Sequence, residues 1–154
     1  MKETTRSAVV VLHHSVSGAI SRLAETIADQ FRPFADVTVA DIVDADPADL
    51  AHADLIVVGV PTELLRILPR ASKPAHFAAF STRTMNAPES LTGSTAESID
   101  HETRAAGYLP LTPPREFVID DAGQMVDGQA AAAAEWGTLL AGRLNLHRER
   151  QLAE

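Results

Sequence analysis

Unbroken apolar runs alternate with helical apolar spacing along the first half of this chain. Residues 8–12 and 55–60 are apolar throughout and rich in β-branched side chains, which is typical of strands buried on both faces of a parallel sheet. Between them, apolar residues recur at helical spacing over 20–31, and the alternating segment 37–42 predicts a half-exposed strand. Strand, helix and strand in this order predict parallel βαβ units with right-handed crossovers.

The second half continues the same alternation with weaker patterns. Asp46 is the predicted N-cap of a short helix whose first residue is Pro47. Ser94 and Glu97 have the spacing of a capping box and predict a helix that ends near Gly107. The other predicted elements are one or two helical turns at 64–68, a strand at 76–80 running into 81–84, a strand at 117–119 and a helix at 129–144.

Chain length and composition predict one domain. The 154 residues are 45% hydrophobic, enough for one sizeable core. No internal repeat or linker divides the chain, so we assign residues 1–146 to a single domain. Residues 147–154 are expected to form a charged, solvated tail.

Charge and cysteine content narrow the classes of partner and site. Thirteen basic residues against 21 acidic ones give a net charge of -8, which argues against nucleic acid and suits docking on a basic partner protein. With no cysteine, the chain cannot hold disulfides, thiolate metal sites or iron–sulfur clusters. The N-terminus lacks a signal pattern and no apolar run approaches the roughly 18 residues of a membrane span, so we expect a cytoplasmic protein.

The junction at residues 7–21 is the first candidate site. An apolar strand passes there through a small, hydroxyl-rich turn into an amphipathic helix. The free N–H groups and dipole of a helix's first turn favour an anion, so the junction could bind a phosphate. The alternative is a serine- and glycine-rich helix N-cap with no ligand.

Residues 14–21 also resemble the phosphate loop of flavodoxins, which has the form hydroxyl-x-hydroxyl-Gly-Asn-Thr after the first strand. Ser15, Ser17 and Gly18 match this pattern, whereas Ala19 and Ile20 stand where Asn and Thr are usual.

Further motifs extend the resemblance over residues 7–144. Residues 58–62 look like the Gly-x-Pro-Thr that ends the third strand of flavodoxins, and residues 79–83 are similar to the Ala-Phe-Asp-Thr-Arg of small single-domain flavodoxin-like bacterial proteins. Residues 108–109, 117–118 and 127–137 follow the C-terminal half of that group in order. The resemblance implies a flavodoxin-like doubly wound three-layer α/β sandwich with a five-stranded parallel sheet of order 2-1-3-4-5.

The resemblance further implies flavin mononucleotide (FMN) at the switch point between the first and third strands. Its phosphate would be surrounded by Ser15, Val16, Ser17, Gly18, Ala19, Ile20 and Ser21. Its isoalloxazine would be flanked by Pro61, Thr62, Glu63, Ser81, Thr82 and Arg83. The expected role is electron transfer or FMN-dependent oxidoreduction with a redox partner protein.

The departures from flavodoxins fall at the ring. Flavodoxins commonly stack the flavin against Trp or Tyr. Here the loop after Thr62 offers Leu64 and Leu65, and the loop after Thr82 offers Arg83, Met85 and Asn86. The segment before the fourth strand is also short, so the helix on this flank is expected to be reduced. Two readings stay open: an exposed flavin covered by a partner, or a flavin-free interaction or regulatory module on the same scaffold.

Single residues also have ordinary structural readings. His13 and His14 would face opposite sides of a strand, so they cannot both bind one metal from it. Arg83 could pair with a phosphate or simply be solvated. The adjacent carboxylates at 120–121 are expected to cap and turn the chain, and Trp136 has the spacing of a core residue.

Three other classes lack their motifs. A phosphoacceptor receiver domain needs acidic residues after the first strand and an Asp that ends the third, and neither is present. A Gly-x-Ser-x-Gly nucleophile elbow and a Rossmann glycine fingerprint are also missing.

Overall fold

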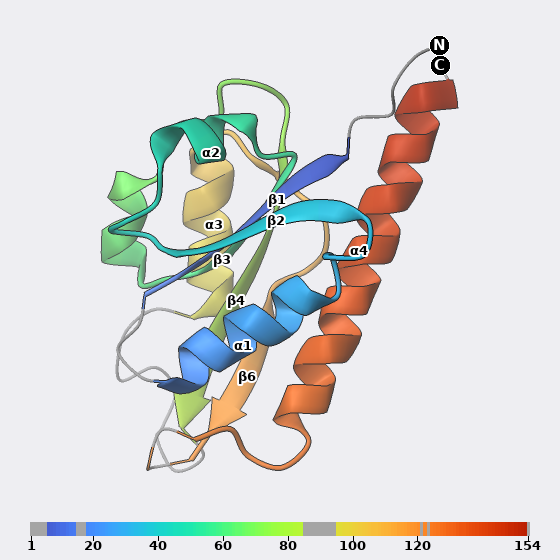
Figure 1. Cartoon of the computed structure of the whole chain (residues 1–154). Helices are drawn as coiled ribbons and strands as arrows, with labels where there is room; N and C mark the ends of the chain where they lie inside the picture. Colours follow the sequence, from blue (N-terminus) through green and yellow to red (C-terminus); the bar gives the residue numbers. More distant parts are fainter. Residues whose placement is uncertain (1–5, 15–17, 85–94, 121, 123, 154) are drawn as a thin grey trace.

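A parallel sheet forms the middle layer of the molecule (Figure 1). The computed structural model describes residues 6–14, 18–84, 95–120, 122 and 124–153. The strands are β1 (Ser7–His13), β2 (Ala35–Asp41), β3 (Leu55–Gly59), β4 (His76–Thr84), β5 (Leu109–Pro110) and β6 (Arg115–Ile119). Their order is β2-β1-β3-β4-β5, with β6 also paired to β4, which confirms the predicted order 2-1-3-4-5.

The fifth place in the sheet is shared by two short strands. β5 pairs with the start of β4 through His76 and Phe77, and β6 pairs with its second half from Phe80 to Thr84. Pro113 and Pro114 lie between β5 and β6. Because proline has no N–H to donate to a ladder, these residues separate the two strands. Of the two, only β6 is predicted by the sequence, as the strand at 117–119.

Helices cover both faces of the sheet. On one face lie α1 (Gly18–Asp29) and the long α4 (Gln129–Ala153), side by side in Figure 1. The other face is covered by α2 (Pro47–His52), the 3-10 helix η1 (Thr62–Ile67) and α3 (Ala96–Ala105). Between β3 and β4 the chain forms only the six-residue 3-10 helix η1. This agrees with the predicted reduction of the helix before the fourth strand.

Each face has its own apolar core. Val9, Val11, Phe80, Phe117 and Trp136 belong to the core under α1 and α4, so the core reading of Trp136 is confirmed. The opposite core is made by alternate strand residues together with Leu50, Leu65 and Ile99 from the covering helices. The apolar runs without polar alternation follow directly from a sheet buried on both sides.

Local capping differs from the prediction at one helix and agrees at another. Asp46 caps α2, and its carboxylate accepts from Ala48 N at 2.9 Å. The N-cap of α3, however, is Thr95 rather than Ser94, and its box partner is Ser98 rather than Glu97. The pattern was right in kind and one residue out of register.

The last helix is longer than predicted. It was expected to end near Leu144 but runs to Ala153, and half-buried His147 and Arg148 contact the strand starts at His76 and Ser7. Within the residues that the structure describes, no helix is both long and apolar enough to cross a membrane.

Candidate functional site

The carboxyl ends of β1 and β3 lie together at one edge of the sheet. The two strands end in register, with His13 opposite Gly59. From there the chain enters α1 on one face and η1 on the other, so neighbouring connections leave in opposite directions. A doubly wound sheet has its binding crevice at such a switch point.

The predicted phosphate end is only partly described. Ser15, Val16 and Ser17 lie outside the described residues. Gly18, Ala19, Ile20 and Ser21 form the first turn of α1, with the Ile20 and Ser21 side chains half-buried. That turn carries no acidic residue, so no carboxylate competes with an anion for its N–H groups.

The second predicted group follows β3. Pro61 precedes η1, and its carbonyl accepts from Leu64 N at 3.0 Å. Thr62 is half-buried and Glu63 exposed at the start of η1. Pro61, Thr62 and Glu63 therefore follow the carboxyl end of β3.

The third predicted group lies in a strand. Ser81, Thr82 and Arg83 all belong to β4, so the expectation of a loop beginning after Thr82 was wrong. Alternation places Ser81 and Arg83 on one face and Thr82 on the other. β3 pairs with β4 only as far as Ala79, whereas β6 continues alongside to Thr84.

Glu116 on β6 binds two members of this group. Arg83 Nε lies 2.8 Å from Glu116 Oε1, and Ser81 Oγ donates to Glu116 Oε2 at 3.4 Å. Arg83 is thus held in an ion pair, which corrects the reading of a merely solvated arginine. Sequence reasoning missed Glu116, because its alternation with Phe117 gives the face on which it lies but not its partner on β4.

Gly59 has a packing role at this edge. A Cβ there would lie 2.1 Å from Phe80 Cζ. The Phe80 ring therefore occupies the space that a side chain at 59 would need. The ring also makes edge-to-face contacts with Phe117 and Trp136, which fix it in the core under α1 and α4.

The histidines at the end of β1 are in different surroundings. Burial lowers the pKa of His13, against the opposing effects of Asp41 and Glu25, so His13 is mainly neutral near pH 7. His14 Nδ1 lies 3.4 Å from Asp41 Oδ1. Among the described residues no three potential ligands are grouped as a metal site.

Two other predicted ring neighbours are placed as follows. Leu65 is buried in the core on the α3 face, so it cannot stack on a flavin, whereas Leu64 is half-buried against the same core. Met85 lies outside the described residues. Asp120 turns the chain as expected, accepting from Ala122 N and Gln124 N at 2.9 Å, and Asp121 is outside the described residues.

Solved structures resemble this fold, but no family model and no curated protein matches the sequence. A flavodoxin from the domain Archaea has a TM-score of 0.72 at 20% identity, covering 89% of this chain and 98% of that one. A flavodoxin from Streptococcus pneumoniae TIGR4 has a TM-score of 0.68 at 14% identity, over 88% and 98% of the two chains.

A third neighbour is part of a larger protein. The Flv1 flavodiiron core from Synechocystis has a TM-score of 0.72 at 18% identity, over 93% of this chain but only 37% of that one. Identities this low show the fold alone. The chain therefore has a flavodoxin-like fold, which confirms the predicted fold class.

Proposed function

We propose that this protein binds FMN at the carboxyl edge of its sheet and acts in electron transfer. The observation that carries the proposal is the paired ending of β1 and β3 at His13 and Gly59, with α1 and η1 leaving on opposite faces. In a flavodoxin-like order this is the ligand crevice. The flavodoxins among the neighbouring structures support the choice of ligand.

The phosphate would bind at the first turn of α1. Gly18 allows close approach of the main chain, and the turn has no carboxylate of its own. Ser15, Ser17 and Ser21 would supply hydroxyl donors. The bound flavin would supply the redox chemistry, while this chain's residues bind and orient it.

The ring would lie between the start of η1 and the outer end of β4. Thr62 and Arg83 would flank the ring there, and Glu116 fixes the guanidinium of Arg83. No aromatic side chain occurs in η1 or in residues 81–84, so one ring face would be exposed for a partner. The net charge of -8 favours a basic redox partner.

The second candidate is a flavin-free interaction module on the same scaffold. The sequence offers Leu65 as a neighbour of the flavin ring, but in the structure Leu65 is buried in the core. Without an aromatic stacking partner, the free energy of flavin binding is weaker by roughly 0.5–1.5 kcal/mol. This loss favours a scaffold that does not bind flavin.

A titration with FMN, followed by flavin fluorescence quenching, separates these candidates, with riboflavin as the phosphate-free control. Saturable binding that needs the phosphate is expected. Absence of binding up to about millimolar FMN, a free energy weaker than roughly -4 kcal/mol, would leave the flavin-free module.

A glycine variant tests the phosphate position. Gly18→Val is expected to abolish FMN binding in a protein that stays folded, since a side chain would hold the phosphate away from the main chain. Gly142→Val is the matched control, because a Cβ at Gly142 meets no atom within 4 Å. Unchanged affinity in Gly18→Val would rule out this phosphate site.

A further inference from the structure

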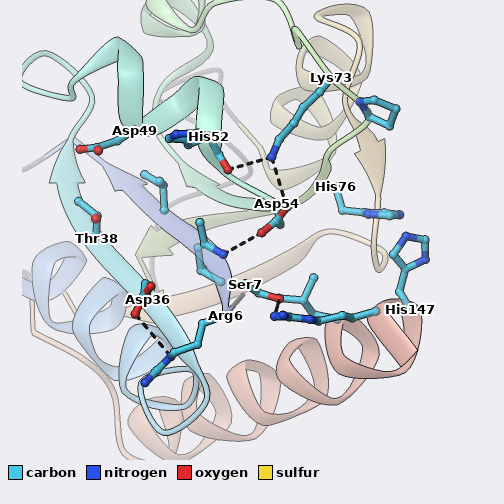
Figure 2. Close-up of a pocket in the computed structure, with 16 residues that line it drawn as sticks. Arg6, Ser7, Asp36, Thr38, Asp49, His52, Asp54, Lys73, His76 and His147 are labelled. Atoms are coloured by element: carbon cyan, nitrogen blue, oxygen red, sulfur yellow. Dashed lines mark hydrogen bonds and ion pairs between the residues drawn. The ribbon is translucent and has the colours of Figure 1, made fainter. Parts of the chain in front are cut away.

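A hollow lies at the amino edge of the sheet, opposite the proposed FMN site (Figure 2). It has a volume of about 620 Å³ and is bordered by the first residues of the strands, by α2 and by the C-terminal part of α4. Since the proposed FMN site is at the carboxyl edge, whatever binds here is independent of that proposal.

Four of the charged side chains in the hollow neutralise each other. Arg6 Nε lies 3.4 Å from Asp36 Oδ1, and Lys73 Nζ lies 3.3 Å from Asp54 Oδ1. Asp54 also accepts from Ala8 N at 2.8 Å. Figure 2 shows Lys73 and Asp54 pointing toward each other across the hollow. Within each pair the two charges cancel, so these four side chains offer a ligand no net charge.

The cationic residue left over is Arg148. Its Nη1 donates to Ser7 Oγ at 3.0 Å, a neutral acceptor, and within the described part of the chain no carboxylate lies at ion-pair distance from it. Ser7 is buried and keeps its own hydroxyl proton to donate. A guanidinium and a hydroxyl therefore present donors without a counter-charge.

Two histidines border the same hollow. The ring centroids of His76 on β4 and His147 on α4 are 4.3 Å apart at 73°, and Figure 2 shows them next to each other. Burial lowers the pKa of His76, and His147 lowers it further. An anion beside the pair would favour the protonated form of His76.

The remaining titratable groups are farther round the rim. His52 and Asp49 lie on α2, which borders another side of the hollow from α4. His52 contributes its backbone carbonyl to Lys73 Nζ at 3.0 Å. Asp36 and Asp54 are held in the ion pairs described above, and Asp49 lies on the opposite side of the hollow from His147 (Figure 2).

We propose that this hollow binds a tetrahedral oxyanion carrying two negative charges, free phosphate or the phosphate of a small phosphomonoester, between Arg148, His76 and His147. Guanidinium, imidazolium and hydroxyl groups can bind different oxygens of such an anion. The volume leaves space for an organic group attached to the phosphate.

The test uses sulfate first, because sulfate keeps its double charge across the pH range in which histidine titrates. The full chain is titrated with sodium sulfate at constant ionic strength, and the ring protons of the six histidines are followed by NMR. Saturable shifts at His76 and His147 are expected. Sulfate should bind about tenfold more tightly at about pH 5.5 than at about pH 8, because anion and proton binding favour each other.

Two variants of equal charge locate the site. Arg148→Gln is expected to lose the saturable shifts, whereas Arg150→Gln, exposed on the same helix and outside the hollow, should keep them. Equal loss in both variants, or equal unsaturated shifts at all histidines, would overturn the proposal. So would a response of His76 and His147 to Zn²⁺ with none to sulfate.

A competition experiment distinguishes the two ligand sources. Inorganic phosphate and glycerol phosphate are each added to the sulfate-loaded protein at about pH 7. Displacement by both supports the site, and the tighter of the two identifies free phosphate or phosphomonoester. Failure of both to displace sulfate would contradict the assignment to phosphate.

Discussion

Gly59, the last residue of β3, leaves room for the Phe80 ring because it has no side chain. The Phe80 ring lies over it and is fixed by edge-to-face contacts with Phe117 and Trp136, at centroid distances of 6.2 and 6.1 Å. The resemblance placed Gly59 in a strand-ending motif. The structure adds a packing reason for glycine that needs no ligand.

Gly59→Ala is therefore expected to lower the free energy of unfolding by about 1–3 kcal/mol, the usual cost of overpacking a core. The new Cβ would lie 2.1 Å from Phe80 Cζ, so the Phe80 ring would have to move. Urea denaturation followed by tryptophan fluorescence measures the change, because Trp136 contacts the same ring.

Gly142→Ala is the control for this variant. It lies within α4, and a Cβ there meets no atom within 4 Å. Helix propensity then predicts a gain of up to about 1 kcal/mol. A loss in both variants of similar size would show that the effect at Gly59 does not come from the Phe80 ring.

The candidate site was predictable residue by residue only where it depends on chain order. Thr62 lies three residues after the end of a strand recognisable from its apolar run, so its place near the carboxyl edge could be predicted. The ion pair of Arg83 with Glu116 could not, because it depends on the register of β4 against β6. A period-2 pattern gives the face of a residue but not its cross-strand partner.

At the scale of elements, the start of α3 is held by a capping box. Thr95 Oγ1 accepts from Ser98 N at 3.1 Å, and Ser98 Oγ accepts from Thr95 N at 2.9 Å. Thr95→Ala is expected to cost about 1 kcal/mol of unfolding free energy. Ser94→Ala, one residue earlier, should cost much less in the same chemical denaturation experiment; the reverse result would place the cap at Ser94.

The 3-10 helix η1 decides how the flavin ring would be covered. Leu64 is half-buried at its start. If FMN binds as proposed, Leu64→Tyr is expected to tighten binding about two- to tenfold, since aromatic stacking contributes roughly 0.5–1.5 kcal/mol. Leu139→Tyr on the outer side of α4 is the control, because Leu139 is exposed there.

Both variants are titrated with FMN under the conditions used for the unmodified protein. An equal gain from Leu64→Tyr and Leu139→Tyr would indicate nonspecific flavin adsorption. No gain from Leu64→Tyr would remove the ring from the start of η1, while the phosphate position tested through Gly18 could still stand.

Elements with a long hydrophobic pattern were predicted from the sequence. Very short elements, and element ends that depend on tertiary contacts, were not. The runs that became β1 and β3 carry enough apolar residues to identify a buried parallel strand. β5 has only two residues, Leu109 and Pro110, too few for any periodicity. The extension of α4 beyond Leu144 depends on contacts of His147 and Arg148 with strand starts, which no local pattern encodes.

At the scale of the whole molecule, the two edges of the sheet have different electrostatics. The carboxyl edge combines a helix N-terminus with the neutral His13. The amino edge combines Arg148 with two adjacent histidines. Both favour anions, and each edge has a histidine, His13 or His76, that gains positive charge as pH falls.

The same histidines make the stability of the fold depend on pH. Burial is the largest effect on both His13 and His76 and lowers each pKa below the ordinary histidine value of about 6.5. The unfolded chain therefore binds protons that the folded chain does not, once pH falls below about 6.5. Their contribution to stability is fully present above that pH and is lost as pH falls toward the folded-state pKa values.

We expect the urea midpoint to decrease as the pH is lowered from about 7.5 to about 5.5. The buffer must be free of divalent anions. His76→Gln should reduce this fall, whereas His101→Gln, exposed on α3, should not. Sulfate should restore stability at the acidic pH because an anion beside Arg148 stabilises the protonated imidazoles of the folded state. If sulfate restores stability equally in Arg148→Gln, its stabilising effect does not come from the proposed anion site. The pH dependence would then arise from the histidines alone.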